Sequence, residues 1–308
     1  MIGMVILILA LLLDITLGEP SNRYHPVAWL GKLISFQLKF SPETGSVQQF
    51  VYGAWIVFLT ASVIVVPLYY ALSFLQNLNI VVYTIISAYL LKNAFSLRGL
   101  WLAVQKVKQC LLRDDIANAR LEITALVSRD TQDLSRQQLI SASIESCAEN
   151  LCDSFVAPLF FYAIFGLPGA IVYRVINTFD AMIGFHGRWE YTGKFAARLD
   201  DVVNYIPARI SSFLIVLASL YTGRAGDGWQ AMLKEHSKTE SPNAGWTMGA
   251  MAGTLGIELE KAGAYKLGAG TETISTASIS RSQIIMLLSS AMWSLVIIAM
   301  EVAVDAAR

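Results

Sequence analysis

Long uncharged stretches separated by short polar segments dominate this chain. Residues 44–91 contain no charged residue, and a polar break at 76–79 divides them in two. Residues 282–300 are also uncharged and are followed by Glu301. Because a helix needs about 20 mainly apolar residues to cross a bilayer, these stretches predict a transmembrane hairpin and a C-terminal transmembrane helix.

Three further apolar stretches are shorter or interrupted. Residues 1–13 lack a basic start and an A-x-A cleavage pattern, which favours a retained helix over a removed signal peptide. A Gly-Leu-Pro-Gly sequence at 166–169 interrupts the stretch at 154–173 and indicates a broken or re-entrant helix buried in protein. The stretch at 210–223 crosses only if the residues before it, including Arg209, join it. The predicted spans are 1–18, 51–75, 80–97, 154–176, 203–222 and 282–300.

The polar segments suggest how the spans are oriented. Residues 92–136 carry eight Lys and Arg residues, so the positive-inside rule makes them cytoplasmic. Apolar residues at helical spacing predict amphipathic helices within 98–153. If residues 154–176 cross the bilayer completely, the segment 224–281 lies on one side of the membrane. If they form a re-entrant turn, this segment lies on the opposite side. The hydrophobic pattern leaves both arrangements open. The prediction is an all-α, polytopic membrane bundle forming one integral membrane domain over 1–308, with broken or re-entrant helices, amphipathic cytoplasmic helices and polar segments at 177–209 and 224–281.

Composition supports a membrane protein and excludes other classes. Of the 308 residues, 55% are hydrophobic and only 15% are charged, where soluble domains have about 25% charged residues. The 23 basic and 23 acidic residues balance, so the charge surplus of a nucleic-acid-binding protein is missing. The three cysteines form no C-x-x-C pair, which argues against a structural zinc site. The chain also lacks a P-loop sequence, so ATP would have to bind in another way.

Acidic residues recur at helical spacing just before the interrupted stretch. Glu145, Glu149 and Asp153 are four residues apart, which places them near one face of a helix. One interpretation is a solvated acidic face, with Ser146 and Glu149 forming a capping box. The other is an acidic face at membrane level, where a hard divalent cation would neutralise it.

A second polar cluster lies between two apolar stretches. An adjacent pair of carboxylates followed by an amide and an arginine suits Mg²⁺ and phosphate oxygens. An ordinary network of ion pairs is the alternative. The cluster comprises Asn177, Asp180, Arg188, Lys194, Arg198, Asp200, Asp201, Asn204 and Arg209.

Small residues mark another segment. Gly245, Gly249 and Gly253 recur at every fourth position, which favours close helix packing. Substrate contact stays open for the polar and aromatic residues of this segment, Ser241, Asn243 and Trp246. His25 follows a turn-rich sequence and is a candidate for a polar loop at the membrane surface.

Several motifs in a fixed order carry a resemblance to a known family. They cover residues 14–20 with 25–31, 145–153 with 157–158, 166–184, 197–209 and 241–253. Together they resemble the CobD/CbiB family of cobalamin-biosynthesis proteins, the adenosylcobinamide-phosphate synthases, over roughly residues 10–268. Glu19 stands where the family often has Asp, and Thr247 where Pro is common.

The resemblance implies a multi-pass enzyme of the cell membrane, the inner or plasma membrane, that acts as an ATP-dependent acid–amine ligase. Its substrates would be the corrinoid adenosylcobyric acid and (R)-1-amino-2-propanol O-2-phosphate or a related amino-alcohol phosphate. The product would be adenosylcobinamide phosphate, with Mg²⁺ as cofactor and ATP as co-substrate. The lipid bilayer and other membrane-associated enzymes of cobalamin assembly would be its partners, and no nucleic acid is expected.

This chemistry gives the polar residues expected roles. Glu149, Asp180, Asp200 and Asp201 are expected to hold Mg²⁺. The expected catalytic residues are Glu145, Glu149, Asp153, Lys194, Arg198 and Arg209, with Glu145 or Asp153 as the base and the cations binding phosphate. The expected substrate-binding residues are His25, Asn177, Asn204, Ser241, Asn243 and Trp246.

Two other classes of protein are compatible with the same pattern. A non-enzymatic membrane sensor related to AmpE proteins would share the architecture without forming an amide. A transporter would also contain broken helices and intramembrane carboxylates. The number and order of the motifs favour the enzyme.

Overall fold

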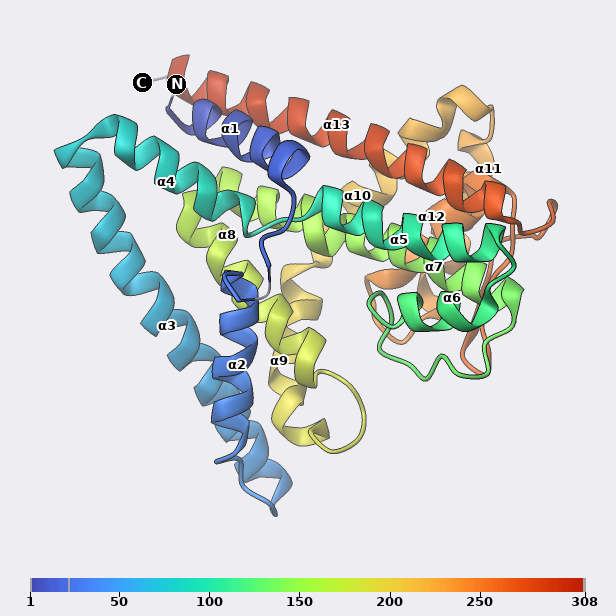
Figure 1. Ribbon diagram of the computed structural model, residues 1–308, viewed down its shortest axis with the longest axis horizontal. Coiled ribbons are helices and arrows are strands. Elements are labelled where there is room, and N and C mark those ends of the chain that lie inside the picture. Colours follow the sequence, from blue (N-terminus) through green and yellow to red (C-terminus); the bar gives the residue numbers. More distant parts are fainter. Residues whose placement is uncertain (1, 22, 307–308) are drawn as a thin grey trace. The chain divides into compact units, whose positions relative to one another are not determined.

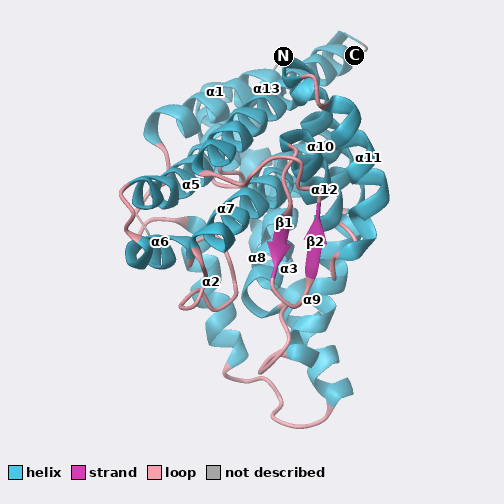
Figure 2. Ribbon diagram, turned by 90° about the vertical axis from the view of Figure 1, so that its right-hand side faces the viewer, coloured by secondary structure: helices cyan, strands magenta, loops and turns pink. Residues whose placement is uncertain are grey.

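The computed structural model describes residues 2–21 and 23–306 of the chain. It is 78% helical, which confirms the predicted all-α class (Figure 1). Two short strands form a hairpin (Figure 2). Five helical segments are long and apolar enough to cross a membrane, which makes this a multi-pass membrane protein. They are Ser46–Leu78, Ile80–Leu112, Arg136–Ile183, Tyr205–Thr222 and Thr276–Val304.

The first predicted span forms a shorter helix than expected. Helix α1, Ile2–Leu17, is apolar but has only 16 residues. At 1.5 Å per residue it is about 24 Å long, whereas the hydrocarbon core of a bilayer is about 30 Å thick. The helix is therefore present as predicted. It could cross the membrane completely only if it stood perpendicular to the membrane plane and the bilayer became thinner around it.

The chain divides into two compact units. The first contains the residues up to Ser96, Ala157–Val203 and the residues from Ile297 onward, and the second contains Leu97–Val156 and Asn204–Val296. Helix α13, Thr276–Ala306, begins in the second unit and ends in the first.

The first unit is built around four packed helices. These are α2 (Pro26–Leu38), α3 (Ser46–Leu78), α8 (Ala157–Ile183) and α9 (Glu190–Val203), and α1 packs on α4 (Ile80–Lys92) beside them (Figure 1). Their shared core includes Ile34, Ile56 and Phe179, each fully buried. The side chain of Asn79 accepts hydrogen bonds from the backbone N–H groups of residues 81 and 82, so the predicted polar break caps α4.

Helix α8 turns back on itself at Gly166. This residue has φ 67° and ψ −162°, a conformation that only glycine adopts readily. The rings of Phe161 and Tyr173 stack with centroids 5.4 Å apart, whereas twelve residues of continuous helix would separate them by about 18 Å. The predicted interruption is therefore confirmed, and this segment is a folded-back hairpin and not one straight crossing. The break is buried only in part, because Leu167 is 6% exposed whereas Phe165 is 63% exposed.

The second unit contains the remaining helices and the strand hairpin. Its helices are α5 (Leu97–Leu112), α6 (Ile116–Ile123), α7 (Arg136–Leu151), α10 (Tyr205–Ala218), α11 (Ala225–Glu235), α12 (Ala244–Leu255) and the first part of α13. A π-helical turn at Cys152–Val156 follows α7, and 3-10 turns occupy Ser219–Thr222 and His236–Lys238. Strands β1 (Leu259–Lys261) and β2 (Tyr265–Leu267) pair antiparallel (Figure 2).

Two expectations about α7 are wrong. The helix is not an amphipathic surface helix, because residues 139–148 are all buried. The capping box is formed by Ser135 and Gln138 at the start of α7, not by Ser146 and Glu149. Because α7 packs against several other elements of the unit, more of its surface is buried than its hydrophobic spacing alone predicts.

The small-residue segment packs as predicted. Helix α12 lies against α11, where a Cβ at Gly253 would stand 2.6 Å from the carbonyl oxygen of Asp227. A Cβ at Gly249 would likewise stand 3.4 Å from the carbonyl oxygen of Ala231. The glycine spacing therefore serves the close approach of two helices.

Candidate functional site

In the first unit, a chain of hydrogen bonds connects α8 to α9. Arg174 donates from Nε to the carbonyl oxygen of Ala94 at 2.7 Å and from Nη1 to Oδ1 of Asn177 at 3.1 Å. Because this oxygen of Asn177 accepts from Arg174, its Nδ2 faces Oδ1 of Asp200 at 3.4 Å. Asp200 is buried. The structure thus brings together the predicted residues Asn177 and Asp200, and Arg174, which the sequence analysis missed, fixes the orientation of the amide.

The other predicted residues of α8 and α9 differ in their exposure and in their partners. Asp180 follows Asn177 by three residues and so shares its face of α8. Arg198 pairs with Asp201 at 3.7 Å, and its side chain is 74% exposed. Lys194 is exposed, with Nζ 5.9 Å from the ring centroid of Tyr191. The ion-pair alternative is therefore observed for Arg198 and Asp201, on a helix and not in a loop.

The predicted Mg²⁺ ligands fall into both units. Asp180, Asp200 and Asp201 supply carboxylate oxygens, which are the donors that Mg²⁺ prefers, while Glu149 belongs to the second unit and is exposed. Across the described ranges, no three His, Cys, Asp or Glu side chains are grouped so that they could hold a metal ion alone. The donors on α8 and α9 suit a Mg²⁺ ion that shares its coordination with a substrate phosphate, and the assignment stays a prediction.

A second polar network in the first unit surrounds a buried lysine. Lys92, at the end of α4, is only 3% exposed. Its Nζ lies 3.0 Å from Oε2 of Glu19 and 3.9 Å from Oδ1 of Asp14, which is also buried. No motif in the sequence connects Lys92 with Asp14 and Glu19, although a lone charge at the end of an apolar helix is a recognisable signal.

His25 joins this network as a helix cap. Its Nδ1 accepts the backbone N–H of Val27 at 3.1 Å, so Nε2 carries the proton and donates to Glu19 at 2.7 Å. Both ring nitrogens are therefore engaged within the protein. His25 thus starts α2 and ties it to Glu19, and its expected role in substrate binding stays a prediction.

The carboxyl group of Glu19 is strongly stabilised as an anion. Burial by itself raises its pKa, but hydrogen bonds from His25, Ser96 and Lys92 outweigh burial and lower the pKa from 4.5 to about 2. A depressed carboxyl pKa stabilises the fold above the unfolded-state pKa, and this contribution is lost as the pH falls.

We therefore expect a pH-dependent difference between the protein and its Glu19→Gln variant. At pH 7 the variant should be less stable by roughly 1–2 kcal/mol, because water screens this partly exposed carboxylate and reduces the effect of the lowered pKa. The difference should shrink as the pH falls from about 4.5 toward 2, because Glu19 then becomes protonated. Thermal unfolding in detergent over this pH series measures the difference, and a gap that does not change with pH contradicts the assignment.

In the second unit, Glu145 is buried among hydrogen-bond donors. Its Oε1 accepts from the Ser141 hydroxyl at 2.6 Å. Its Oε2 accepts from the Tyr265 hydroxyl at 3.0 Å and lies 3.4 Å from Nη2 of Arg129. Burial, with the nearby Glu145 carboxylate, raises the pKa of the Tyr265 phenol, so this hydroxyl stays a donor. These contacts join α7 to β2 through the Glu145 side chain.

The three acidic residues of this region do not share one environment. Glu145 is buried, Glu149 is exposed and Asp153 is partly buried in the π-helical turn. The π-helical turn adds a residue to one helical turn, so the regular four-residue spacing no longer holds after α7. The predicted common face therefore holds for Glu145 and Glu149, which both raise the pKa of the Tyr265 phenol, whereas Asp153 follows in the π-helical turn.

A stack of aromatic and cationic side chains joins α10 to α12. The guanidinium of Arg209 lies 3.6 Å from the ring centroid of Tyr205 and 4.7 Å from that of Trp246. The ring of His236 stacks on that of Trp246, with the two ring centroids 4.3 Å apart. Oδ1 of Asn243 accepts from Nη1 of Arg209 at 2.8 Å. The structure thus assembles Arg209, Asn243 and Trp246, which were predicted separately.

Two predicted residues flank this stack along the chain. Asn204 precedes α10 and is buried, with Oδ1 3.9 Å from Sγ of Cys152. The hydroxyl of Ser241 accepts the backbone N–H of Asn243 at 3.2 Å and so shapes the start of α12. Both residues position the helices that carry the stack.

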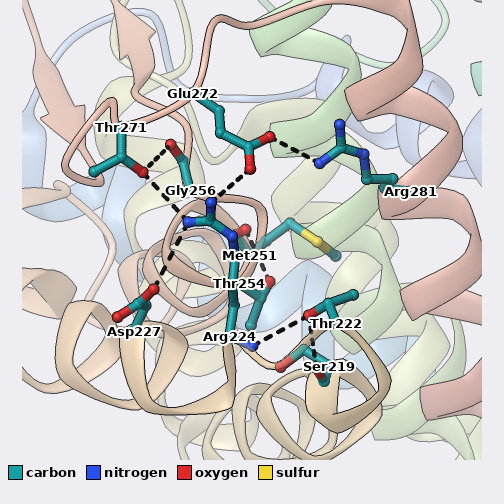
Figure 3. A network of polar contacts seen from close by, with 10 residues as sticks. All are labelled: Ser219, Thr222, Arg224, Asp227, Met251, Thr254, Gly256, Thr271, Glu272 and Arg281. Carbon is teal, nitrogen blue, oxygen red and sulfur yellow. Dashed lines mark hydrogen bonds and ion pairs between the residues drawn. The ribbon is translucent and has the colours of Figure 1, made fainter.

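A polar pocket of about 340 Å³ lies elsewhere in the second unit. One of its walls is held by Arg224, which donates to Glu272 at 2.5 Å and to Thr271 at 3.3 Å, while Arg281 binds the other oxygen of Glu272 (Figure 3). Its acidic side chains are thus paired with cations. The lining residues are Gln137, Gln138, Ser141, Glu258, Glu260, Ala269, Gly270, Glu272, Thr273 and Ile274.

Comparison with known proteins gives consistent matches over almost the whole chain. The model of the family described as CobD/Cbib protein matches residues 7–289. The cobalamin biosynthesis protein CobD of Dehalococcoides mccartyi is 46% identical over 294 residues, covering 95% of this chain and 96% of the relative. The probable cobalamin biosynthesis protein CobD of Methanococcus maripaludis is 40% identical over 286 residues, covering 90% and 92%. No solved structure matches the chain significantly.

Proposed function

Because the chain belongs to the CobD/Cbib protein family, which places it in cobalamin biosynthesis, we propose that it is the enzyme that joins adenosylcobyric acid to an amino-alcohol phosphate. The reaction forms an amide between a propionate carboxylate of the corrinoid and the amine of aminopropanol phosphate or a related compound. ATP would convert the carboxylate to an acyl phosphate, the amine would displace the phosphate together with the carboxylate oxygen, and the product would be adenosylcobinamide phosphate. The observation that carries this proposal is that the model of this family matches residues 7–289 of the chain.

The polar chain of α8 and α9 supports a phosphate site in the first unit. Asn177 and the buried Asp200 are held in register by Arg174, and Asp180 follows on the same face of α8. Mg²⁺ bound to the carboxylates Asp180, Asp200 and Asp201 would neutralise the charge of the ATP phosphates. Lys194 and Arg198 are exposed on α9, where they can attract anionic substrates.

Two acidic residues are candidates for the general base, and they differ in their exposure to solvent. The amine must lose a proton before or during its attack on the activated carbonyl carbon. Glu145 already accepts hydrogen bonds from Ser141 and Tyr265 and pairs with Arg129, so it is suited to positioning. Asp153 is partly exposed in the π-helical turn, and we assign the proton transfer to it.

The proposed setting is the cell membrane, with a soluble corrinoid and an amino-alcohol phosphate as substrates. Five helical segments fit a multi-pass protein. An enzyme held in the inner or plasma membrane can pass its product to other membrane-associated enzymes of cobalamin assembly.

The test is direct reconstitution of the reaction. The full chain, purified in detergent, is incubated with adenosylcobyric acid, aminopropanol phosphate, ATP and Mg²⁺, and the corrinoid is followed by mass spectrometry. We expect a mass gain that matches the amide and that disappears when ATP is omitted. A folded protein that forms no amide under any of these conditions would overturn the proposal, and uptake of a solute into vesicles without product formation would support a transporter instead.

Paired variants of α9 examine the Mg²⁺ assignment. We expect the double variant Asp200→Asn, Asp201→Asn to lose at least about 100-fold in rate, because two charges that stabilise the transferring phosphoryl group are removed. Glu190→Gln is the matched control, since Glu190 is an acid of the same helix whose carboxylate lies 3.6 Å from Nδ1 of His186. Full activity of the double variant at limiting Mg²⁺ would remove these two residues from the metal site.

A further inference from the structure

The stack around Arg209 holds its guanidinium in a fixed orientation. Two aromatic rings flank it, at 3.6 Å for Tyr205 and 4.7 Å for Trp246. Nη1 donates both to the carbonyl oxygen of Tyr205 at 2.7 Å and to Oδ1 of Asn243 at 2.8 Å. A guanidinium fixed in this way loses little conformational entropy when it binds a further acceptor.

The positive charge of this guanidinium has no negative partner within the described part of the chain. Arg209 is partly buried, and its hydrogen bonds there go to two neutral oxygens, with no ion pair. Other arginines of the second unit do have carboxylate partners, such as Arg129 with Glu145 and Arg224 with Glu272. Because a charge removed from water is costly unless it is paired, the stack is suited to an anion from outside the chain.

A second donor in the stack also has no acceptor. Nε1 of Trp246 is completely buried and has no hydrogen-bond partner among the residues described. Buried N–H groups of this kind are rare and indicate a missing acceptor. Asn243, the residue before α12, does not cap that helix with its side chain, because its oxygen faces Arg209. The start of α12, the positive end of its dipole, therefore lies beside the unpaired guanidinium.

We propose that Arg209, Trp246 and Asn243 form a binding site for a phosphate group of a substrate. Arg209 supplies the charge and the remaining guanidinium donors, Trp246 supplies an indole N–H, and Asn243 with Tyr205 keeps the guanidinium in place. A phosphate matches these donors better than a carboxylate does, because its oxygens can accept from several directions at once. This inference rests on the proposed function for the identity of the ligand, since the amino-alcohol phosphate and ATP both carry phosphate groups.

Binding without turnover tests the site. Inorganic phosphate, aminopropanol phosphate, ADP and acetate are each titrated into the full chain in detergent at low ionic strength, by isothermal titration calorimetry. We expect at least one phosphate compound to bind, at least ten-fold tighter than acetate. The compound that binds tightest distinguishes the amino-alcohol phosphate from the nucleotide as the source of the phosphate.

Three variants separate the contributions of the Arg209 charge, the guanidinium stack and the Trp246 N–H group to phosphate binding. Arg209→Met should weaken phosphate binding at least ten-fold, and Arg209→Lys should restore only part of it because lysine cannot form the same stack. Trp246→Phe keeps a ring but removes the N–H donor, and it should weaken binding several-fold. Arg113→Met is the matched control, since Arg113 is an exposed arginine of the same unit and should leave binding unchanged. Thermal unfolding of each variant confirms that it is folded.

The possible outcomes distinguish a failure of the phosphate site from a failure of the proposed reaction. No binding of any phosphate compound to the unmodified protein, binding of acetate as tight as that of phosphate, or equal binding by folded Arg209→Met would each overturn the site. None of these titrations contains corrinoid or depends on amide formation, so a failed reconstitution leaves them interpretable. Conversely, ATP-dependent product formation with unchanged rates in Arg209→Met would overturn the site while supporting the reaction.

Discussion

Replacing Lys92 with methionine is expected to destabilise the protein by about 3–5 kcal/mol, the effect of removing one partner from a buried ion pair. Lys92 is 3% exposed and Asp14 is 1% exposed, so neither charge is solvated by water. In Lys92→Met the carboxylates of Asp14 and Glu19 face each other without the ammonium group that separates them. Their repulsion and the lost pairing act on the three segments that meet here, the ends of α1 and α4 and the start of α2.

A second substitution should recover part of this loss. In the double variant Asp14→Asn, Lys92→Met, one unpaired negative charge is removed, and the double variant should be more stable than Lys92→Met alone. Lys106→Met is the control, because Lys106 is 65% exposed and its nitrogen lies 4.0 Å from Glu122. That change should cost less than about 1 kcal/mol. Unfolding temperatures in detergent measure all four proteins, and equal effects of Lys92→Met and Lys106→Met would show that the buried network does not stabilise the fold.

Replacing Gly53 with alanine is the second change with a large expected effect. Gly53, on α3, packs against the first turn of α9, where an added Cβ would overlap the carbonyl oxygen of Thr192. That oxygen belongs to the backbone and cannot rotate away. Gly193 follows Thr192 in α9, and a Cβ added there would likewise overlap the carbonyl oxygen of Ile183 on α8. Helix α9 therefore has no room to shift. We expect a loss of about 1–3 kcal/mol or more, because the core helices must separate.

Gly226→Ala provides the matched comparison. Gly226 is in the first turn of α11, and an added Cβ would meet nothing within 4 Å. Alanine favours a helix over glycine, so this change should be neutral or stabilising by up to about 1 kcal/mol. If both glycine variants unfold at the same temperature as the unmodified protein, the close packing of α3 and α9 does not contribute to stability.

The membrane-spanning helices and their interruptions could be predicted because their signals are local. The polar break at 76–79 became the cap of α4, and the Gly-Leu-Pro-Gly sequence became the turn at Gly166. The glycines of 245–253 became a helix interface. In each case the residues that determine the structure are neighbours along the chain, so composition and spacing were sufficient.

The candidate site was only partly predictable. Arg209, Asn243 and Trp246 were each singled out from sequence, but their convergence on one stack was not. Glu145 was placed on an acidic face, whereas its partner Tyr265 lies 120 residues away and holds it in the interior. Helical spacing describes one helix and contains no information about which other elements cover it.

The sequence by itself determined the all-α class, the main apolar spans and the family, because hydrophobicity and motif order are properties of consecutive residues. Only the tertiary structure decided which charges are paired. It placed Lys92 between Asp14 and Glu19, aligned Arg174 with Asn177 and Asp200, and left Arg209 without an anion among the described residues. The physical reason is that the cost of a buried charge depends on the groups around it in space, and these groups come from segments that are distant in the chain.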